Sequence, residues 1–452
     1  MEKVDVVILG SGQGGNPLAV ALANAGKRTV LIEREHVGGT CVNVGCTPTK
    51  TMIASGRAAY LARRSDDYGV RTGDVSVDMQ KVRQRKRDIV EQWRSGSESS
   101  IDGADGLELI MAEGRFTGPK TVRAGDREIT ADTIVINVGE RPAPLQVPGA
   151  DSVEILDSTT IMELDEVPAH LVVIGGGNIG LEFGQLFRRL GSDVTIVHHS
   201  RQLLGREDPD IAGAVRDVLE EDGIRVLLNT SASDLRKRDG GIDVTLDNGS
   251  VLHASHVLGA IGRTSNADSL DLGKAGVESD KRGHIPTNDM LETNVPGIYA
   301  IGDVRPGPKF THISYDDFRI LQANLIEGKQ ASIAGRQVPY VIYIDPQLGR
   351  IGMTEQQARE AGTAIRVAKM PMSRVARATE TAEPRGIMKV VVDAETERIL
   401  GAAILGIEGG EIMAMLQIAM LGNLPYTTLR DGIFAHPSLA EGFNNLFSSF
   451  EE

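Results

Sequence analysis

The sequence contains few cysteine and aromatic residues. Only two of its 452 residues are cysteine, and Phe, Trp and Tyr together make up 4%. Two cysteines cannot build the disulfide framework of a small secreted domain. No apolar run approaches the roughly 18 residues that a membrane-spanning helix needs, and the strand-like first residues lack the residue order of a signal peptide. We therefore expect a cytoplasmic protein without a membrane partner.

Positive charge is also scarce. The chain has 48 Lys and Arg residues against 62 Asp and Glu residues, so its net charge is −14. Such a chain repels nucleic-acid phosphates, and we expect no nucleic-acid partner. The basic run at 83–87 is interpreted as a solvated helix face. Glycine, in contrast, is abundant, with 52 residues, which indicates tight turns and close backbone approaches.

A pattern of strand, glycine turn, helix and strand occurs twice, at a constant offset of 165 residues. Both copies place three glycines between an apolar strand and a helix: Gly10, Gly12 and Gly15 in the first, and Gly175, Gly177 and Gly180 in the second. These glycines allow a tight turn, close approach to a pyrophosphate and close helix–strand packing. Two copies in this context predict two Rossmann-like nucleotide-binding domains.

The two predicted nucleotide sites differ in charge at the end of their second strand. Glu33 ends that strand in the first copy, where a carboxylate binds ribose hydroxyls. The equivalent position in the second copy is His198, followed by His199 and Arg201. A carboxylate would repel a 2′-phosphate, whereas this cluster could bind one, so the sequence favours NADPH over NADH. The alternative is that both histidines are ordinary surface residues and that the site takes NADH.

The two cysteines, Cys41 and Cys46, follow the first nucleotide motif near the start of a predicted helix. A helix N-terminus lowers the pKa of a thiol and favours a nucleophilic thiolate. A structural zinc site needs four ligands, and His36 is the only other good ligand nearby, so we expect no metal site.

Residues 38–50 closely resemble the active site of the flavin disulfide reductases, the family of glutathione reductase, dihydrolipoamide dehydrogenase and mercuric reductase. The resemblance covers nearly the whole chain. Further matching segments lie at 179–182, 262–266, 298–303 and 436–441. Residues 309–319 look most like the mercuric-reductase-like and reactive-chlorine-resistance branch.

The resemblance implies which residues bind the cofactors. The first glycine turn and Glu33 would hold the ADP half of FAD, and Asp303 would bind the ribityl chain. The second turn would bind the nicotinamide nucleotide. The same matches imply three further cofactor-binding residues: Thr40, Gly262 and Gly302.

The resemblance also implies catalytic roles. Lys50 would lie near flavin N5, paired with Glu182. Cys46 would face the flavin, and Cys41 would attack the substrate. His436 would be the acid–base catalyst, oriented by Glu441, and it would come from the other subunit of a homodimer.

The sequence therefore predicts an α/β protein with two Rossmann-like nucleotide-binding domains plus a C-terminal α+β dimerisation domain. The expected ranges are 1–145 and 266–335 for the FAD-binding domain, 146–265 for the NAD(P)-binding domain and 336–452 for the dimerisation domain. Asn178, in place of a tyrosine, and Ser265, in place of a proline, depart from the family pattern.

The predicted function is an FAD-dependent NAD(P)H oxidoreductase that passes electrons through a Cys41–Cys46 disulfide to a disulfide or related small acceptor. His436 is typical of family members that act on disulfides. The chain ends without the cysteine pair that mercuric reductases carry there. Alternatives are a metal-ion reductase, acting on mercuric or cupric ions, and a non-catalytic flavoprotein subunit of a larger complex.

Overall fold

A computed structural model describes residues 2–450, which fold into two compact units. The first unit contains the chain up to Thr51 and the stretches Lys81–Ala143 and Gly262–Arg336. The second contains Met52–Gln80, Pro144–Ile261 and the chain from Gln337 onward. Each unit is therefore assembled from segments that are far apart in the sequence.

The first unit is built on a seven-stranded sheet with the order β3-β2-β1-β6-β5-β4, in which β17 also pairs with β6. Strands β3, β2, β1, β6 and β17 are parallel to one another. Leu9 lies opposite both Ile32 and Ile136, so the carboxyl ends of β1, β2 and β6 meet at one edge. The strands are β1 (Glu2–Leu9), β2 (Thr29–Glu33), β3 (Leu107–Met111), β4 (Gly114–Gly118), β5 (Thr121–Ala124), β6 (Arg127–Ile136) and β17 (Ile298–Ala300).

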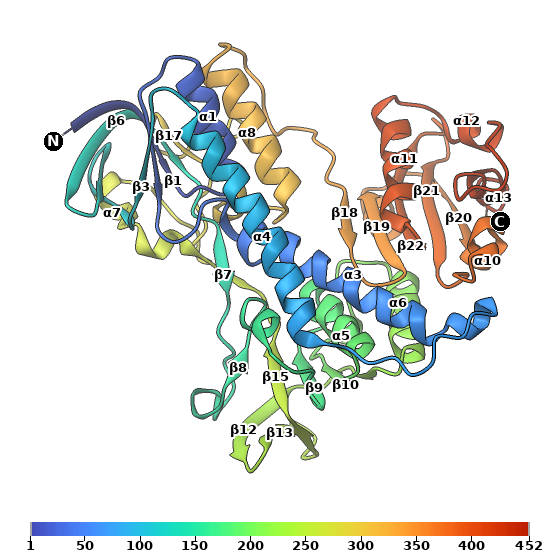
Figure 1. The fold of residues 1–452 in the computed structure, drawn as a ribbon. Coiled ribbons are helices and arrows are strands. Elements are labelled where there is room, and N and C mark those ends of the chain that lie inside the picture. Colours follow the sequence, from blue (N-terminus) through green and yellow to red (C-terminus); the bar gives the residue numbers. More distant parts are fainter. Residues whose placement is uncertain (1, 451–452) are drawn as a thin grey trace. The chain divides into compact units, whose positions relative to one another are not determined.

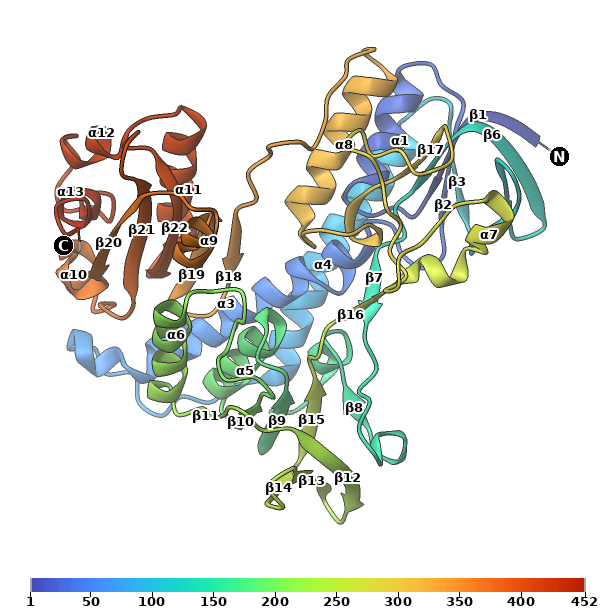
Figure 2. The ribbon, with the colours of Figure 1, turned by 180° about the vertical axis from the view of Figure 1, so that it is seen from behind.

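Both faces of this sheet are buried, which explains the continuous apolar run of β1. Val6 and Ile8 pack into one core, to which α1 and α8 contribute, while Val7 and Leu9 pack into another on the opposite face. Figures 1 and 2 both show α1 and α8 side by side against the sheet. The helices and small strands of this unit are α1 (Gly15–Asn24), α2 (Gly39–Asn43), α7 (Leu272–Ala275), α8 (Thr311–Leu325), η4 (Asn266–Ser269), η5 (Gly302–Val304), β7 (Glu140–Pro142) and β16 (Arg263–Ser265).

Two long helices each contribute residues to both units. They are α3 (Cys46–Arg63) and α4 (Met79–Asp102), and η1 (Ser65–Tyr68) follows α3. The basic run at 83–87 lies on α4. Its residue Lys86 is only 3% exposed, so the prediction that the whole run is solvated was wrong at that position. A helix turns its side chains in different directions, and a continuous run therefore cannot lie on one face.

The second unit contains the second copy of the repeated pattern in a five-stranded parallel sheet, β11-β10-β9-β15-β8. Helix α5 follows the glycine turn, as predicted. A three-stranded antiparallel sheet, β12-β13-β14, accompanies it. The elements are β8 (Ile155–Leu156), β9 (His170–Ile174), α5 (Asn178–Leu190), β10 (Asp193–Val197), α6 (Pro209–Glu221), β11 (Arg225–Leu227), β12 (Ala232–Arg238), β13 (Gly241–Leu246), β14 (Val251–Ala254), β15 (His256–Gly259), η2 (Ala150–Ser152) and η3 (Thr160–Glu163).

The C-terminal part of the second unit is α+β, as the sequence predicts. Its antiparallel sheet has the order β18-β19-β22-β21-β20. Helix α11 packs so closely on β19 that a Cβ added at Gly349 would lie 2.4 Å from the Gly409 carbonyl oxygen. The elements are β18 (Tyr340–Ile342), β19 (Gln347–Gly352), α9 (Glu355–Glu360), β20 (Ile365–Pro371), η6 (Met372–Arg374), α10 (Ala376–Glu380), β21 (Ile387–Asp393), β22 (Ile399–Gly406), α11 (Gly409–Leu421), α12 (Tyr426–Arg430) and α13 (Gly442–Leu446). Across residues 2–450, every helix is too short or too polar to cross a membrane.

Candidate active site

The first glycine turn is packed against the end of β6. A Cβ at Gly10 would lie 2.5 Å from the Asn137 carbonyl oxygen, and one at Gly15 would lie 2.2 Å from the Gly10 oxygen. At Gly12 it would lie 2.9 Å from Asn137 Oδ1, which accepts a hydrogen bond from the Gly15 N–H at 2.9 Å. All three glycines are therefore required by the fold around the turn.

Glu33, at the end of β2, lies beside this turn. Its Oε2 accepts hydrogen bonds from the N–H and the hydroxyl of Ser11, at 2.9 and 2.7 Å, and its Oε1 accepts one from the Glu35 N–H at 2.9 Å. The carboxylate is thus held at the carboxyl edge of the sheet, where an adenosine ribose binds in folds of this type.

Asp303, on η5, is a half-buried carboxyl group in the same unit. Burial and, secondarily, the Glu140 charge raise the pKa of Asp303 to about 6, although Arg263 and Lys309 oppose this. Among the residues described, none donates a hydrogen bond to its carboxylate. A half-buried acceptor without donors from the chain fits a ligand that brings hydroxyl groups.

The turn that carries Asp303 is held rigidly. The Gly302 N–H donates to Asp317 Oδ2 at 2.9 Å, and Lys309 Nζ donates to the carbonyl oxygens of Asp303 and Arg305. Near the first glycine turn, Asn16 Oδ1 is buried and has no partner within the described chain. The Asp303 carboxylate, Asn16 Oδ1 and the glycine turn together fit the flavin nucleotide that the sequence predicts.

The cysteine segment lies directly on the first glycine turn. Gly38 and Gly39 have φ values of +96° and +64°, which favour glycine. A Cβ at Gly39 would lie 2.7 Å from the Cα of Gly12. At Gly45, a Cβ would lie 2.7 Å from the Thr40 carbonyl oxygen, so a glycine allows the tight connection between α2 and α3. This path brings both cysteines to the nucleotide site.

Cys41 lies on α2, and Cys46 is the first residue of α3. The pKa of Cys41 is strongly raised, first by its hydrogen bond to Cys46 and then by burial. Cys46 Sγ lies 3.5 Å from Thr311 Oγ1, at the start of α8. Sequence reasoning missed Thr311, because nothing in the sequence connects it to a cysteine 265 residues away. Lys50 is one helical turn beyond Cys46 on α3.

The second glycine turn, in the second unit, differs from the first in one respect. A Cβ at Gly175 would lie 2.2 Å from the Ala260 oxygen, and one at Gly180 would lie 2.2 Å from the Gly175 oxygen, so both are required by packing. At Gly177, the N-cap of α5, a Cβ would meet nothing within 4 Å. The protein leaves this space open where a dinucleotide pyrophosphate approaches the helix.

His198 occupies the position equivalent to Glu33 and makes the equivalent backbone contact. Its Nδ1 accepts a hydrogen bond from the Gly176 N–H at 3.1 Å, just as Glu33 accepts from Ser11. Burial and, to a lesser extent, the neighbouring His199 lower the pKa of His198. The imidazole is therefore neutral at pH 7. The other hydrogen-bond donors of this cluster belong to the exposed side chains of His199 and Arg201.

Two other predicted residues, Glu182 and Gly262, lie in defined settings. Glu182, on α5, is buried and accepts a hydrogen bond from the Tyr343 N–H at 2.9 Å. Its predicted pairing with Lys50 joins residues of different units and stays a prediction. Gly262 has a φ of +131°, and its carbonyl oxygen accepts a hydrogen bond from the Ala143 N–H at 3.0 Å.

His436 and Glu441 form the predicted pair in the C-terminal part of the second unit. His436 Nδ1 lies 2.9 Å from Glu441 Oε2 and 3.2 Å from Oε1. A carboxylate can only accept, so Nδ1 carries the proton and Nε2 is left as the reactive nitrogen. The His436 side chain is 71% exposed. A proton-transfer group presented to the surface in this way suits a site completed by another chain.

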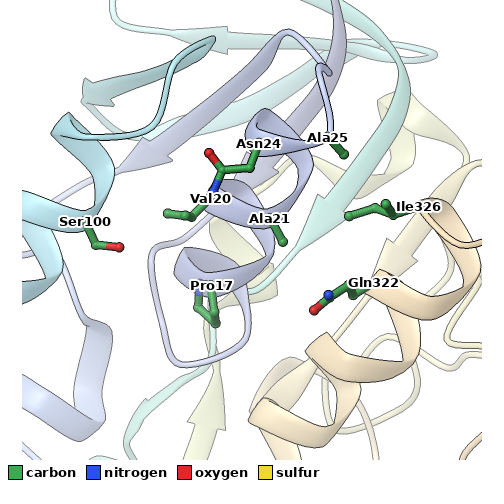
Figure 3. A pocket seen from close by; sticks show the side chains of 8 residues that line it. All are labelled: Pro17, Val20, Ala21, Asn24, Ala25, Ser100, Gln322 and Ile326. Atoms are coloured by element: carbon green, nitrogen blue, oxygen red, sulfur yellow. The ribbon is translucent and has the colours of Figure 1, made fainter.

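A hollow of about 540 Å³ lies apart from these residues, between α1, α4 and α8 in the first unit (Figure 3). Its lining contains no titratable side chain: Pro17, Val20, Ala21, Asn24, Ala25, Ser100, Gln322 and Ile326. It therefore offers no chemistry for the reaction. Among residues 2–450, no three His, Cys, Asp or Glu side chains come together in a metal-binding arrangement.

Two nucleotide-type glycine turns, a dithiol on the first of them and a separate His–Glu pair define a flavin-dependent dithiol–disulfide oxidoreductase. The family model of pyridine nucleotide-disulphide oxidoreductases matches residues 4–317, and the model of the dimerisation domain of that family matches residues 338–447. The chain therefore belongs to the pyridine nucleotide-disulphide oxidoreductase family.

Individual relatives agree with this assignment. RclA of Escherichia coli strain K12, a probable pyridine nucleotide-disulfide oxidoreductase, is 36% identical over 99% of both chains. A mercuric reductase of Bacillus cereus is 34% identical, over 99% of this chain and 72% of its own. The solved structure of the HOCl-induced flavoprotein disulfide reductase RclA from Escherichia coli matches with a TM-score of 0.91 and 35% identity, over 98% of this chain and 99% of that one. The chain is thus a flavoprotein disulfide reductase that uses FAD and a nicotinamide nucleotide, which confirms the predicted family, fold class and enzyme class.

Proposed function

We propose that this enzyme uses NADPH to reduce a small disulfide through the Cys41–Cys46 pair. The observation that carries the proposal is the placement of both thiols on the first glycine turn, where the hydrogen bond to Cys46 and burial raise the pKa of Cys41. Bound FAD would pass the two electrons of the reduced nicotinamide to the Cys41–Cys46 disulfide. The chain's own residues then carry out thiol–disulfide exchange with the substrate.

The exchange begins at Cys41. Because its pKa is raised, Cys41 needs a base before it can attack, and we assign this role to His436 Nε2. The Cys41 thiolate attacks one substrate sulfur and forms a mixed disulfide. The leaving thiolate takes the proton back from His436. Cys46 then attacks Cys41, which restores the Cys41–Cys46 disulfide and releases the second substrate sulfur as a thiolate that takes a proton from water.

Glu441 keeps His436 in the tautomer that this step requires. Its carboxylate accepts from Nδ1–H and stabilises the imidazolium formed when Nε2 takes a proton. Lys50 and Glu182 are proposed to act as a pair near the flavin ring, in line with the predicted roles. A cation at that position would stabilise the reduced ring.

We propose that the active form is a homodimer in which His436 serves the cysteines of the partner chain. Helix α11 presents exposed apolar side chains, Met415, Ile418 and Leu421, at 41%, 69% and 62% exposure, and Leu424 follows them. Close to the catalytic pair, Ile433 is fully exposed. Apolar surface of this extent is typical of a protein–protein interface, and this part of the chain matches the family's dimerisation domain.

The preference for NADPH rests on charge. At the position where a carboxylate would repel a 2′-phosphate, the second site has the neutral His198, with Arg201 and His199 exposed beside it. A cytoplasmic location belongs to the same proposal, because the cytoplasm supplies NADPH and keeps dithiols reduced.

The decisive experiment is a turnover panel on the purified holoenzyme. NADPH and NADH serve as donors, and lipoamide, glutathione disulfide, Hg²⁺, Cu²⁺ and quinones serve as acceptors. We expect NADPH-dependent turnover of a disulfide that is lost in Cys41→Ser and in Cys46→Ser. Turnover of a metal ion with no disulfide reduced would overturn the substrate class, and a tenfold preference for NADH would overturn the donor.

A further inference from the structure

Cys46 lies where the N-terminal ends of two helices meet. It is the first residue of α3, which has 18 residues, and its Sγ is 3.5 Å from Oγ1 of Thr311, the first residue of the 15-residue helix α8. Helix N-termini favour negative charge, and a thiol there loses its proton more readily. A hydroxyl group at the same place can add a direct hydrogen bond to the sulfur.

The contacts of the Thr311 hydroxyl indicate no structural role for it. The N-cap position of α8 is Phe310, and no side chain caps the helix there. Apart from the two cysteines, the described residues offer the Thr311 hydroxyl no hydrogen-bond partner. A threonine that only completed the helix would be expected to bond to a backbone N–H or carbonyl group of its own turn.

We propose that Thr311 is a further catalytic residue, whose hydroxyl donates a hydrogen bond to the Cys46 thiolate in the reduced enzyme. The inference rests on the proposed roles of the two cysteines. Addition of two electrons and one proton to the Cys41–Cys46 disulfide breaks the S–S bond and leaves one thiol and one thiolate. Cys41 keeps the proton, and the Thr311 hydroxyl and the two helix ends hold the charge on Cys46.

The surrounding charges explain why Cys46 needs this donor. The half-buried Asp303 opposes a negative charge on Cys46, since each raises the cost of ionising the other. Glu140, near Asp303, adds a second negative charge, which Lys309 and Arg263 offset in part. Lys50, one turn along α3, is a further cation of the segment. The Thr311 hydroxyl supplies a stabilising contact at the sulfur itself.

The test measures the ionisation of Cys46 in the FAD-loaded Cys41→Ser protein, in which Cys46 is the only thiol. Thiolate ultraviolet absorbance is followed from about pH 4 to about pH 10, with the Cys41→Ser/Cys46→Ser protein as the blank. Thr311→Val, which keeps the shape and removes the donor, should increase the proton affinity of Cys46 about tenfold. Thr311→Ser, which keeps the hydroxyl, should stay within about twofold of the parent.

Equal titrations for Thr311→Val and the parent would overturn the proposal, and so would a Thr311→Ser protein that behaves like Thr311→Val. If Thr311→Val does not fold, Thr311→Ala supplies the same comparison. The titration needs no turnover. If Cys41→Ser retained full disulfide reductase activity, the proposed function would fail, while the titration would still decide the role of Thr311.

Discussion

Glu33 and His198 show how one residue position can serve the fold and the ligand at once. Both side chains accept the backbone N–H one residue after the first glycine of their turn, at 2.9 and 3.1 Å. One does so with a charged carboxylate and the other with a neutral imidazole. The same kind of backbone contact therefore supports the turn in both sites. The side chain at the end of the second strand, where a ribose would bind, is negatively charged in the first site and neutral in the second.

The glycines of the two turns should respond differently to alanine. A Cβ at Gly12 would crowd Asn137 Oδ1, whereas at Gly177 nothing lies within 4 Å. We expect Gly177→Ala to leave the melting temperature within about 1 °C and to weaken NADP⁺ binding at least tenfold, since the methyl group occupies ligand space. Gly12→Ala should instead lower the stability, by about 1–3 kcal/mol. Calorimetric titration measures the NADP⁺ affinity, and thermal unfolding measures the stability. An unchanged NADP⁺ affinity in Gly177→Ala would refute the assignment of the second glycine turn to the nucleotide site.

Asp303 should make FAD binding depend on pH. Its pKa in the folded chain, about 6, lies above its ordinary value of 3.8, so the folded apoprotein binds its proton more tightly than the unfolded chain. The free energy of unfolding of the apoprotein therefore falls between about pH 4 and pH 6, by about 3 kcal/mol, and this contribution is constant above that range. Ribityl hydroxyl groups need the ionised carboxylate as acceptor, so FAD should bind more tightly as the pH rises through about 6.

Fluorescence titration of the apoprotein with FAD checks this expectation. Asp303→Asn should bind FAD at least tenfold more weakly at pH 7 and should lose the step near pH 6, because an amide does not titrate in this range. The same variant should raise the stability of the apoprotein at pH 7, where wild-type Asp303 is charged and partly desolvated. A variant with wild-type FAD affinity and an unchanged pH step would exclude Asp303 from the site.

At the scale of elements, the loop that carries His436 is held at both ends by α13. Glu441, the N-cap residue of α13, bonds to His436 at 2.9 Å. Asn444 Nδ2 bonds to the carbonyl oxygens of Leu429, Arg430 and Gly432, at 3.1, 2.8 and 2.9 Å, where the loop leaves α12. A short helix thus fixes the largely exposed His436, the proposed acid–base group.

We expect Asn444→Ala to impair the step that uses His436. Loss of these hydrogen bonds frees the start of the loop, and kcat should fall about tenfold with KM for NADPH unchanged. The adjacent exposed residue provides a matched control, and Asn445→Ala should behave as wild type. Hydrogen exchange of residues 431–436 should rise in Asn444→Ala only. Equal kcat values for the two variants would show that the loop needs no such support.

At the scale of the whole molecule, the predicted division of the active site between two chains has a direct test. Cys41→Ser dimers and His436→Ala dimers should each be inactive, but a mixed dimer has one site with both native residues. Random exchange makes about half of the dimers mixed, each with one working site, so activity should return to about a quarter of wild type. Persistent inactivity after proven exchange would place both residues of one site on the same chain.

Much of this molecule could be predicted from the sequence because its signals are local. Each strand, glycine turn and helix of the repeat lies within about 30 consecutive residues, and their spacing identifies a nucleotide-binding motif. The Cys41–Cys46 spacing on a helix start and the order of His436 and Glu441 are local in the same way. These patterns determined the fold class, the family and the candidate residues.

Only the tertiary structure decided how distant residues act on that frame. Asn137 contacts Gly15 across 122 residues, and Thr311 contacts Cys46 across 265, so no local pattern could reveal either. Burial and the neighbouring His199 lower the pKa of His198, and the sequence alone shows neither the burial nor the contact with the Gly176 N–H. The sequence therefore determined which functional side chains are present. Their protonation states were decided by the tertiary structure, because hydrogen bonds and burial arise only when distant segments meet.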